Sequence, residues 1–168
     1  AWPEADFIVG NPPFLGTKML RGGLGDEYVD TLFGVYDGTI PAFSDLVCYW
    51  FEKARASISS NPSLRAGLLA TQAIRNDRAR EVLERIKETG GIFMSWADEE
   101  WVLDGAAVQI SIVGFDDGSE VEKTLDGKIV SSINTDLSSG VDLGTAQKIP
   151  DNKSVGFIGD VKGGPFDL

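Results

Sequence analysis

The residues with the clearest chemical potential are Asn11, Pro12, Pro13 and Phe14, which follow a short strand-forming run over residues 7–9 and a glycine. The Asn11 amide carries both a hydrogen-bond donor and an acceptor. The two prolines lack N–H groups and have a fixed φ, so their carbonyl groups point in set directions. Phe14 offers a ring face for stacking. Together these groups could hold a flat, amino-substituted aromatic ring by its NH2 group and by its plane. The alternative is a proline-rich turn without a chemical role.

The amino-acid composition excludes several other kinds of chemistry. The 168 residues include no histidine and a single cysteine, Cys48. This excludes Ser-His-Asp and Cys-His catalysis, HNH-type nuclease chemistry, and zinc sites built from histidine or from cysteine alone. One cysteine also excludes an internal disulfide and fits a reducing compartment. No apolar run reaches the roughly 18 residues of a membrane span, so we expect a cytoplasmic protein without a membrane partner or a metal ion.

The net charge of −11 bears on possible partners. Binding a nucleic-acid backbone requires clustered Lys and Arg, so this chain is not expected to hold DNA by itself, and the simplest role of the charge is solubility. Two basic residues, Lys18 and Arg21, lie in a glycine-rich stretch over residues 16–25, which is predicted to be a loop. That loop is either a mobile connection or a flap whose Lys18 and Arg21 contact DNA phosphate. It contains no G-x-G-x-x-G or P-loop motif.

Hydrophobic periodicity predicts alternating strands and helices. The predicted strands cover residues 7–9, 65–71, 92–96 and 106–115, and the predicted helices cover 26–36, 42–59 and 77–89. Ser44 or Asp45 could cap the second of these helices. Such alternation indicates an α/β fold with a mostly parallel sheet. The last two strands are joined by a predicted loop, 97–105, rather than by a helix, which implies one antiparallel edge.

The sequence changes character after residue 118. Residues 120–133 alternate polar and apolar positions around Asp126-Gly127, which predicts a β-hairpin. Residues 134–154 are rich in small polar residues and are predicted to form a linker, and residues 154–168 again show strand and turn patterns.

The motif Asn11-Pro12-Pro13-Phe14 resembles motif IV of the methyltransferases that act on the N6 amino group of DNA adenine. Further stretches resemble the single-chain restriction-modification enzymes of the MmeI-like type (type IIG or IIL). These stretches are 24–28, 44–51, 67–72, 101–107 and 163–167. The resemblance covers most of residues 5–118 and returns at 155–168.

This resemblance implies the C-terminal half of a Rossmann-like class I methyltransferase sheet, strands four to seven with the last one antiparallel, followed by a β-rich lead-out. Residues 1–118 would be the second half of the catalytic domain, and residues 119–168 would lead toward a target-recognition domain. The loop that binds S-adenosylmethionine would lie upstream of Ala1, so no cofactor-binding residue is assigned here. We therefore expect a piece of a longer protein that is inactive alone, works with its neighbouring domains in cis on duplex DNA, and self-associates through its exposed sheet edge.

The resemblance also implies roles for individual residues. The Asn11 side-chain oxygen and the Pro12 carbonyl would accept the two N–H bonds of the adenine amino group, while Phe14 would stack on a base flipped out of the duplex. Trp101 would close the other face of that base, although packing at the sheet edge explains it as well. Thr71 would line the pocket or cap the following helix.

Two alternatives to a DNA adenine methyltransferase remain. One is a degenerate, non-catalytic methyltransferase module that serves as a scaffold. The other is methylation of another planar amide, such as a protein glutamine; the family that does this favours Tyr at the position of Phe14.

Overall fold

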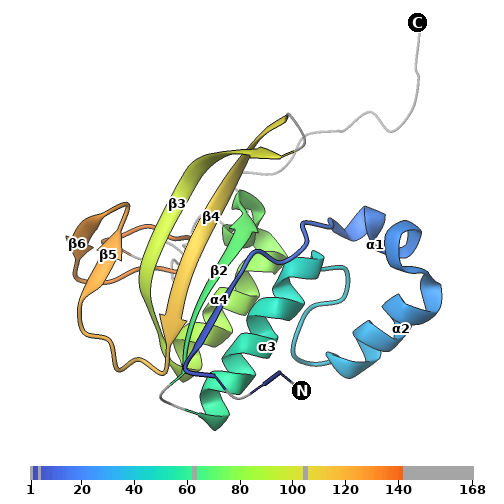
Figure 1. Ribbon diagram of the computed structural model, residues 1–168, viewed down its shortest axis with the longest axis horizontal. Helices are drawn as coiled ribbons and strands as arrows, with labels where there is room; N and C mark the ends of the chain where they lie inside the picture. The colour runs from blue at the N-terminus through green and yellow to red at the C-terminus, as the bar shows by residue number, and fades with distance from the viewer. Residues whose placement is uncertain (1, 4, 62–63, 104–105, 142–168) are drawn as a thin grey trace, which may run out of the picture.

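The protein folds into a six-stranded mixed sheet with helices on one face (Figure 1). The computed structural model describes residues 2–141 except 4, 62–63 and 104–105. The strands are β1 (Phe7–Gly10), β2 (Arg65–Thr71), β3 (Gly91–Leu103), β4 (Ala106–Asp116), β5 (Lys123–Leu125) and β6 (Lys128–Val130). The helices are α1 (Thr17–Leu24), α2 (Asp26–Val35), α3 (Leu46–Ser60), the 3-10 helix η1 (Gln72–Arg75) and α4 (Asp77–Thr89). The linker predicted beyond residue 141 and the segment 154–168 lie outside the described residues.

The sheet order is β1-β2-β4-β3-β5-β6. β1 and β2 are parallel, and β4 is antiparallel to both of its neighbours, β2 and β3. Among β1 to β4, the prediction of one antiparallel strand is confirmed, but its predicted place at the edge is wrong. β4 reverses directly out of β3 and inserts between β3 and β2, while the predicted hairpin over 120–133 forms β5 and β6 and extends the sheet beyond β3.

The predicted loop over 97–105 is also wrong in its described part, because β3 continues through it to Leu103. Register shifts between Ile92 and Met94 and between Trp96 and Glu99 let β3 stay paired with β4 along its length. The loop was predicted because residues 98–100 are all acidic. These side chains are exposed in the structure, so the strand continues without burying a charge.

The glycine-rich stretch predicted as a loop contains helix α1, and α3 begins at Leu46 rather than at residue 42. Leu20 of α1 is 1% exposed, so tertiary burial outweighs the low helix propensity of the two glycines in α1. Gly25, with a φ of 83°, separates α1 from α2. Phe43 has a φ of 68°, which is incompatible with a continuous helix from residue 42.

The core lies between the sheet and the helices α3 and α4, which cover the same face (Figure 1). Phe51 of α3 stacks on Phe115 of β4 with ring centroids 5.7 Å apart, and both side chains are fully buried. Cys48 lies in this core, as predicted, and burial raises the pKa of its thiol to about 12. Within the described residues, the helices are too short or too polar to cross a bilayer.

Candidate functional site

The sheet places Asn11 and its neighbours at the carboxyl end of two parallel strands. β1 ends at Gly10, which pairs with Leu68 of β2, and the chain then leaves the sheet. Asn11 is exposed, Pro12 is buried, and Phe14 is half-buried. In open α/β sheets, ligands bind at the carboxyl ends of the strands, so the position of this segment suits a binding role.

Hydrogen bonding leaves two acceptors free in this segment. The Leu15 N–H donates to the Pro13 carbonyl at 3.1 Å, which closes a tight turn. Across the described residues, neither the Asn11 side-chain amide nor the Pro12 carbonyl takes part in a hydrogen bond. Neither group is therefore occupied by a partner among the described residues, and the proline ring restricts the direction of the carbonyl.

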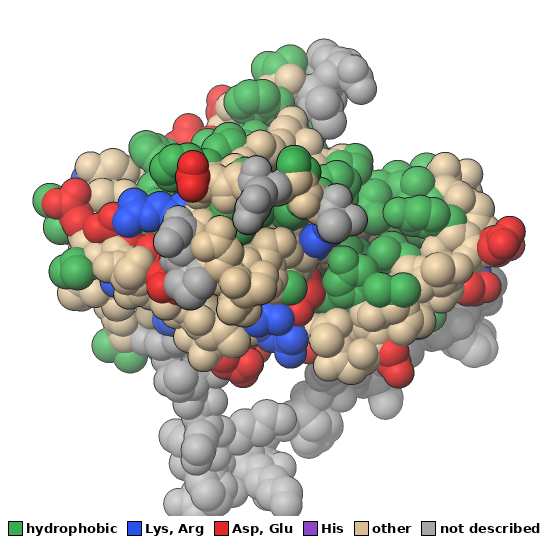
Figure 2. Space-filling view, turned by 60° about the horizontal axis from the view of Figure 1, so that its bottom comes forward, with side chains coloured by type: hydrophobic (Ala, Val, Ile, Leu, Met, Phe, Trp, Pro, Cys, Tyr) green, Lys and Arg blue, Asp and Glu red, His purple; other side chains and the backbone are tan. Residues whose placement is uncertain are grey.

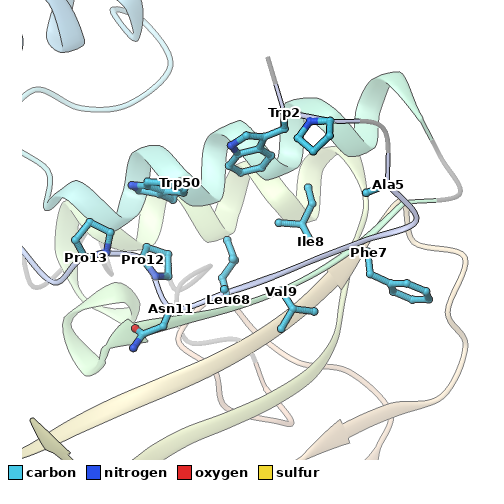
Figure 3. A pocket seen from close by; sticks show the side chains of 12 residues that line it. Trp2, Ala5, Phe7, Ile8, Val9, Asn11, Pro12, Pro13, Trp50 and Leu68 are labelled. Atoms are coloured by element: carbon cyan, nitrogen blue, oxygen red, sulfur yellow. The ribbon is translucent and has the colours of Figure 1, made fainter.

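A cavity of about 320 Å³ lies beside this segment, and its lining is apolar apart from Asn11. Trp50 of α3 and Trp2 form one wall, with ring centroids 5.9 Å apart. In Figure 3, Pro12 and Pro13 face the α3 side of the strand, whereas the Asn11 amide points away from α3. Asn11 thus belongs to the lining of the cavity, although its amide points away from the wall that α3 forms.

The predicted partners Thr71 and Trp101 lie at the same end of the sheet as Asn11. Thr71 ends β2 and pairs with Ile110 of β4, and its side chain makes no capping hydrogen bond to η1. β3 and β4 extend past the end of β2 as a two-stranded ribbon (Figure 1). Trp101 lies on this ribbon opposite Val108 and is 42% exposed. Its ring is therefore accessible near the carboxyl end of the sheet, and its contact with a base remains a prediction.

The two predicted phosphate-binding residues lie on α1 in different environments. Arg21 donates to Asp30 at 2.7 Å and to Asp26 at 2.9 Å. These hydrogen bonds raise the pKa of Arg21. Lys18 is exposed and forms no ion pair with a described residue. On the face shown in Figure 2, Lys and Arg side chains form small separate groups rather than one basic patch.

One residue that positions this segment was not predicted in its role. Asp45 precedes α3 but makes no side-chain hydrogen bond to that helix. Its Oδ1 instead accepts hydrogen bonds from Thr17 N–H at 2.8 Å and from the Thr17 hydroxyl at 3.1 Å. The sequence identified Asp45 as a capping residue, but not which helix it caps, because the two partners are 28 positions apart.

The cavity beside Asn11 does not by itself fit S-adenosylmethionine. The sulfonium and ribose hydroxyls of this cofactor call for acidic or strongly polar partners, and the cavity beside Asn11 is lined without a charged side chain. The outer edge of β1 has no partner strand within the part of the chain that the structure describes, and Phe7 and Val9 on it are 66% and 83% exposed. Across residues 2–141, with the gaps stated above, no group of three acidic, Cys or His side chains is arranged to hold a metal ion.

The strand order, the antiparallel β4 between β2 and β3, and the Asn-Pro-Pro-Phe segment at the carboxyl end of β1 together define a methyltransferase-like α/β fold. Residues 3–126 match the family described as "MmeI, DNA-methyltransferase domain". The chain therefore belongs to the MmeI DNA-methyltransferase domain family.

A solved structure supports the same assignment. The chain is similar to the type IIL restriction-modification enzyme MmeI, whose structure was determined in complex with DNA, with 25% sequence identity and a TM-score of 0.66. The similarity covers 82% of this chain and 20% of the MmeI chain, so this chain spans about a fifth of the length of that enzyme. The comparison with curated proteins found no match.

Proposed function

We propose that this chain is part of a site-specific DNA methyltransferase that transfers a methyl group from S-adenosylmethionine to the N6 amino group of adenine, within a restriction-modification system. The observation that carries the proposal is the pair of free groups at the end of β1, the Asn11 amide and the Pro12 carbonyl. Membership of the MmeI methyltransferase domain family supports the reaction class.

The chemistry of adenine explains why two acceptors are needed. The N6 lone pair is delocalised into the ring, which makes the amino group a poor nucleophile. Acceptors on both of its N–H bonds favour a non-planar nitrogen and localise the lone pair. The Asn11 oxygen and the Pro12 carbonyl would supply these acceptors, and Phe14 would stack on the extruded base.

The remainder of the reaction requires parts outside the described residues. S-adenosylmethionine would supply the methyl group, and the lack of a charged side chain in the cavity beside Asn11 supports a cofactor site elsewhere. We assign residues 1–118 to the second half of a catalytic domain and residues 119–168 to a connection toward a target-recognition domain. Duplex DNA would be held by the full-length protein in the bacterial cytoplasm, with Lys18 and Arg21 near the backbone. The similarity to MmeI, which was solved in complex with DNA, supports DNA as the partner.

The test uses the full-length protein, tritiated S-adenosylmethionine and long plasmid DNA that contains many sequence contexts. The wild type is compared with Asn11→Ala and with Asn61→Ala, an exposed asparagine that precedes β2. Losing a preorganised polar group that acts on the reacting atom costs on the order of 10²–10³ in rate. We expect a loss of that size for Asn11→Ala and none for Asn61→Ala, with N6-methyladenine as the product by nucleoside mass spectrometry.

Two outcomes contradict the proposal. If the wild type transfers no methyl group to DNA, the degenerate-scaffold alternative is favoured. If the label enters protein rather than DNA, methylation of another planar amide is favoured instead.

A further inference from the structure

We infer that Asp45 is a positioning residue for the Asn11-Pro12 acceptor pair: it holds the segment that follows the pair against the start of α3. This inference rests on the proposed function, because the segment that Asp45 holds is the one assigned to the adenine amino group. The supporting observations are the hydrogen bonds that connect the starts of α1 and α3.

The first helix, α1, lacks a capping side chain of its own. Its N-cap residue is Gly16, which has no side chain to accept a hydrogen bond. The first N–H groups of a helix have no partner within the helix and need an external acceptor. Asp45 Oδ1 accepts the N–H of Thr17, the first residue of α1, at 2.8 Å, and also accepts the Thr17 hydroxyl. A residue next to α3 thus caps α1.

A second hydrogen bond connects the same two segments in the opposite direction. The N–H of Leu46, the first residue of α3, donates to the Leu15 carbonyl at 3.0 Å. Thr17 also contacts the carbonyl of Phe43 through its hydroxyl. Each helix start therefore has an N–H satisfied by the segment that precedes the other helix. We call this set of hydrogen bonds between Leu15–Thr17 and Phe43–Leu46 the helix-start clamp.

The clamp restricts the acceptor pair because the connection is short. At one end, Gly10 is paired with Leu68 in the sheet. At the other end, Leu15 is bound to Leu46. Only residues 11–14 lie between these two fixed points. Two of them are prolines with a fixed φ, and the Leu15 N–H to Pro13 carbonyl hydrogen bond closes the turn. Few backbone torsions remain free, so the directions of the Asn11 side chain and the Pro12 carbonyl follow from the two ends.

Loss of Asp45 would weaken one of these ends, where the Leu46 N–H to Leu15 carbonyl bond would remain. The Thr17 N–H would lose its acceptor, the Thr17 hydroxyl would keep only the Phe43 carbonyl, and the start of α1 would depend on the remaining bonds of Leu15 and Phe43. A displacement of about 1 Å at a reacting group costs on the order of 10²-fold in rate. The expected effect of Asp45→Ala is therefore a fall of about 10–100-fold in kcat, with the KM for DNA and for S-adenosylmethionine within about twofold of wild type, because the proposed role of Asp45 is to hold Thr17 and not to bind a ligand.

The experiment uses the full-length protein with three variants and two readouts. Asp45→Ala removes the acceptor, Asp45→Asn retains Oδ1 as an acceptor, and Thr17→Val removes only the hydroxyl. Asp116→Ala is the matched control. Asp116 also accepts backbone N–H groups, those of Gly118 and Glu120, but lies at the opposite end of the sheet. The readouts are steady-state methyl transfer and hydrogen–deuterium exchange of the peptide spanning residues 11–20.

In Asp45→Ala we expect faster hydrogen–deuterium exchange over residues 15–20 and a lower kcat. In Asp45→Asn both the exchange rate and kcat should return most of the way to the wild-type values. In Thr17→Val both should lie between those of the wild type and Asp45→Ala. The control Asp116→Ala should change neither kcat nor the exchange of residues 11–20.

Unchanged exchange over residues 15–20 in both Asp45→Ala and Thr17→Val overturns the clamp itself. A normal kcat together with altered exchange overturns the positioning role. If the wild type does not methylate DNA but the exchange pattern follows the expectation, the proposed function fails while the clamp stands, so the two failures are distinguishable. If Asp45→Ala does not fold, Thr17→Val alone tests the clamp, through both methyl transfer and hydrogen–deuterium exchange.

Discussion

Glu52 of α3 and Arg85 of α4 are joined by two hydrogen bonds of 3.2 Å each, one to each carboxylate oxygen. Arg55, one turn along α3, donates to the same oxygens at 2.8 and 2.7 Å. The side chain of Glu52 is 5% exposed. A single buried carboxylate between two guanidinium groups therefore connects the two helices that cover the sheet.

Substituting Glu52 by Gln should destabilise the chain. Glutamine keeps the shape but loses the charge, and it presents an NH2 group to a guanidinium. Hydrogen bonds to charged groups contribute about 1.5–3 kcal/mol, so we expect a loss of about 2 kcal/mol in the free energy of unfolding in urea. Glu84→Gln is the control, because the Glu84 pair with Arg80 is on the surface, with Glu84 43% exposed. That variant should lose less than about 0.5 kcal/mol. Equal losses of unfolding free energy in Glu52→Gln and Glu84→Gln would contradict a stabilising role of the buried Glu52 carboxylate.

The same carboxylate predicts a pH dependence. Burial alone would raise the pKa of Glu52, but the hydrogen bonds from Arg55 and Arg85 outweigh it and lower the pKa below its ordinary value. A lowered pKa in the folded state means that the stabilisation is present above the ordinary glutamate pKa of about 4.3 and is lost as the pH falls through the folded-state value. The difference in unfolding free energy between wild type and Glu52→Gln should therefore narrow from pH 6 to pH 3. A difference independent of pH across this range would rule out the ionised pair as its source.

Gly90 ends α4 at a point where the helix terminus approaches the end of β4. A Cβ at this position would overlap the backbone carbonyl oxygen of Asp116, which a rotamer change cannot relieve. Gly90→Ala should therefore cost about 3 kcal/mol, at the upper end of the usual range for overpacking. Gly67→Ala in β2 is the control, since a Cβ at that position would meet no atom within 4 Å, and its effect should stay within about 0.5 kcal/mol. Thermal unfolding of both variants checks the comparison. If Gly90→Ala lowers the stability no more than Gly67→Ala does, the end of α4 and the end of β4 can separate, and the prediction is wrong.

The elements of the fold followed from local sequence patterns, whereas the arrangement of some of them did not. The apolar alternation of residues 65–71 and the periodicity of residues 77–89 predicted β2 and α4 with the bounds found. Local patterns cannot show which strands pair, so the insertion of β4 between β2 and β3 was missed. Helix α1 was missed because Gly22 and Gly23 disfavour a helix, while the burial of Leu20 that overrides them is a tertiary effect.

The candidate site shows the same division. Asn11 to Phe14 could be identified because their chemistry is local to one segment, and the strand that places them was also predicted. Asp45 was recognised only as a capping residue, since its bond to Thr17 spans 28 positions and depends on how α1 and α3 meet. Residue types thus predicted which groups could react, and the tertiary structure showed the hydrogen bonds through which Asp45 is proposed to position them.

The open edge of β1 should promote self-association of this 168-residue chain. β1 pairs only with β2 among the described strands, and Val9 on it is 83% exposed. An exposed apolar edge strand is a template for pairing with another chain. We expect a concentration-dependent rise in molar mass by light scattering, which Val9→Lys should reduce because a charge on an edge strand opposes pairing. Val121→Lys is the control, since Val121 is 88% exposed but lies outside the strands. A monomeric wild type at all concentrations would contradict this prediction.

Trp101 provides a test of how the target base is held. It lies on the ribbon that extends past β2 at the same end of the sheet as Asn11, and the residue is 42% exposed. Stacking of a base on an aromatic side chain is worth about 1–3 kcal/mol by alanine substitution. In the full-length protein, Trp101→Ala should therefore lower kcat/KM for DNA by about 10–100-fold, and Trp101→Phe should recover most of it because a ring is restored. Val102→Ala is the matched control: Val102 is the next residue on the ribbon and is 73% exposed, and its side chain points to the opposite face. A loss shared by Trp101→Ala and Val102→Ala would assign Trp101 to packing of the ribbon. A loss confined to Trp101→Ala and rescued by phenylalanine would assign it to the base.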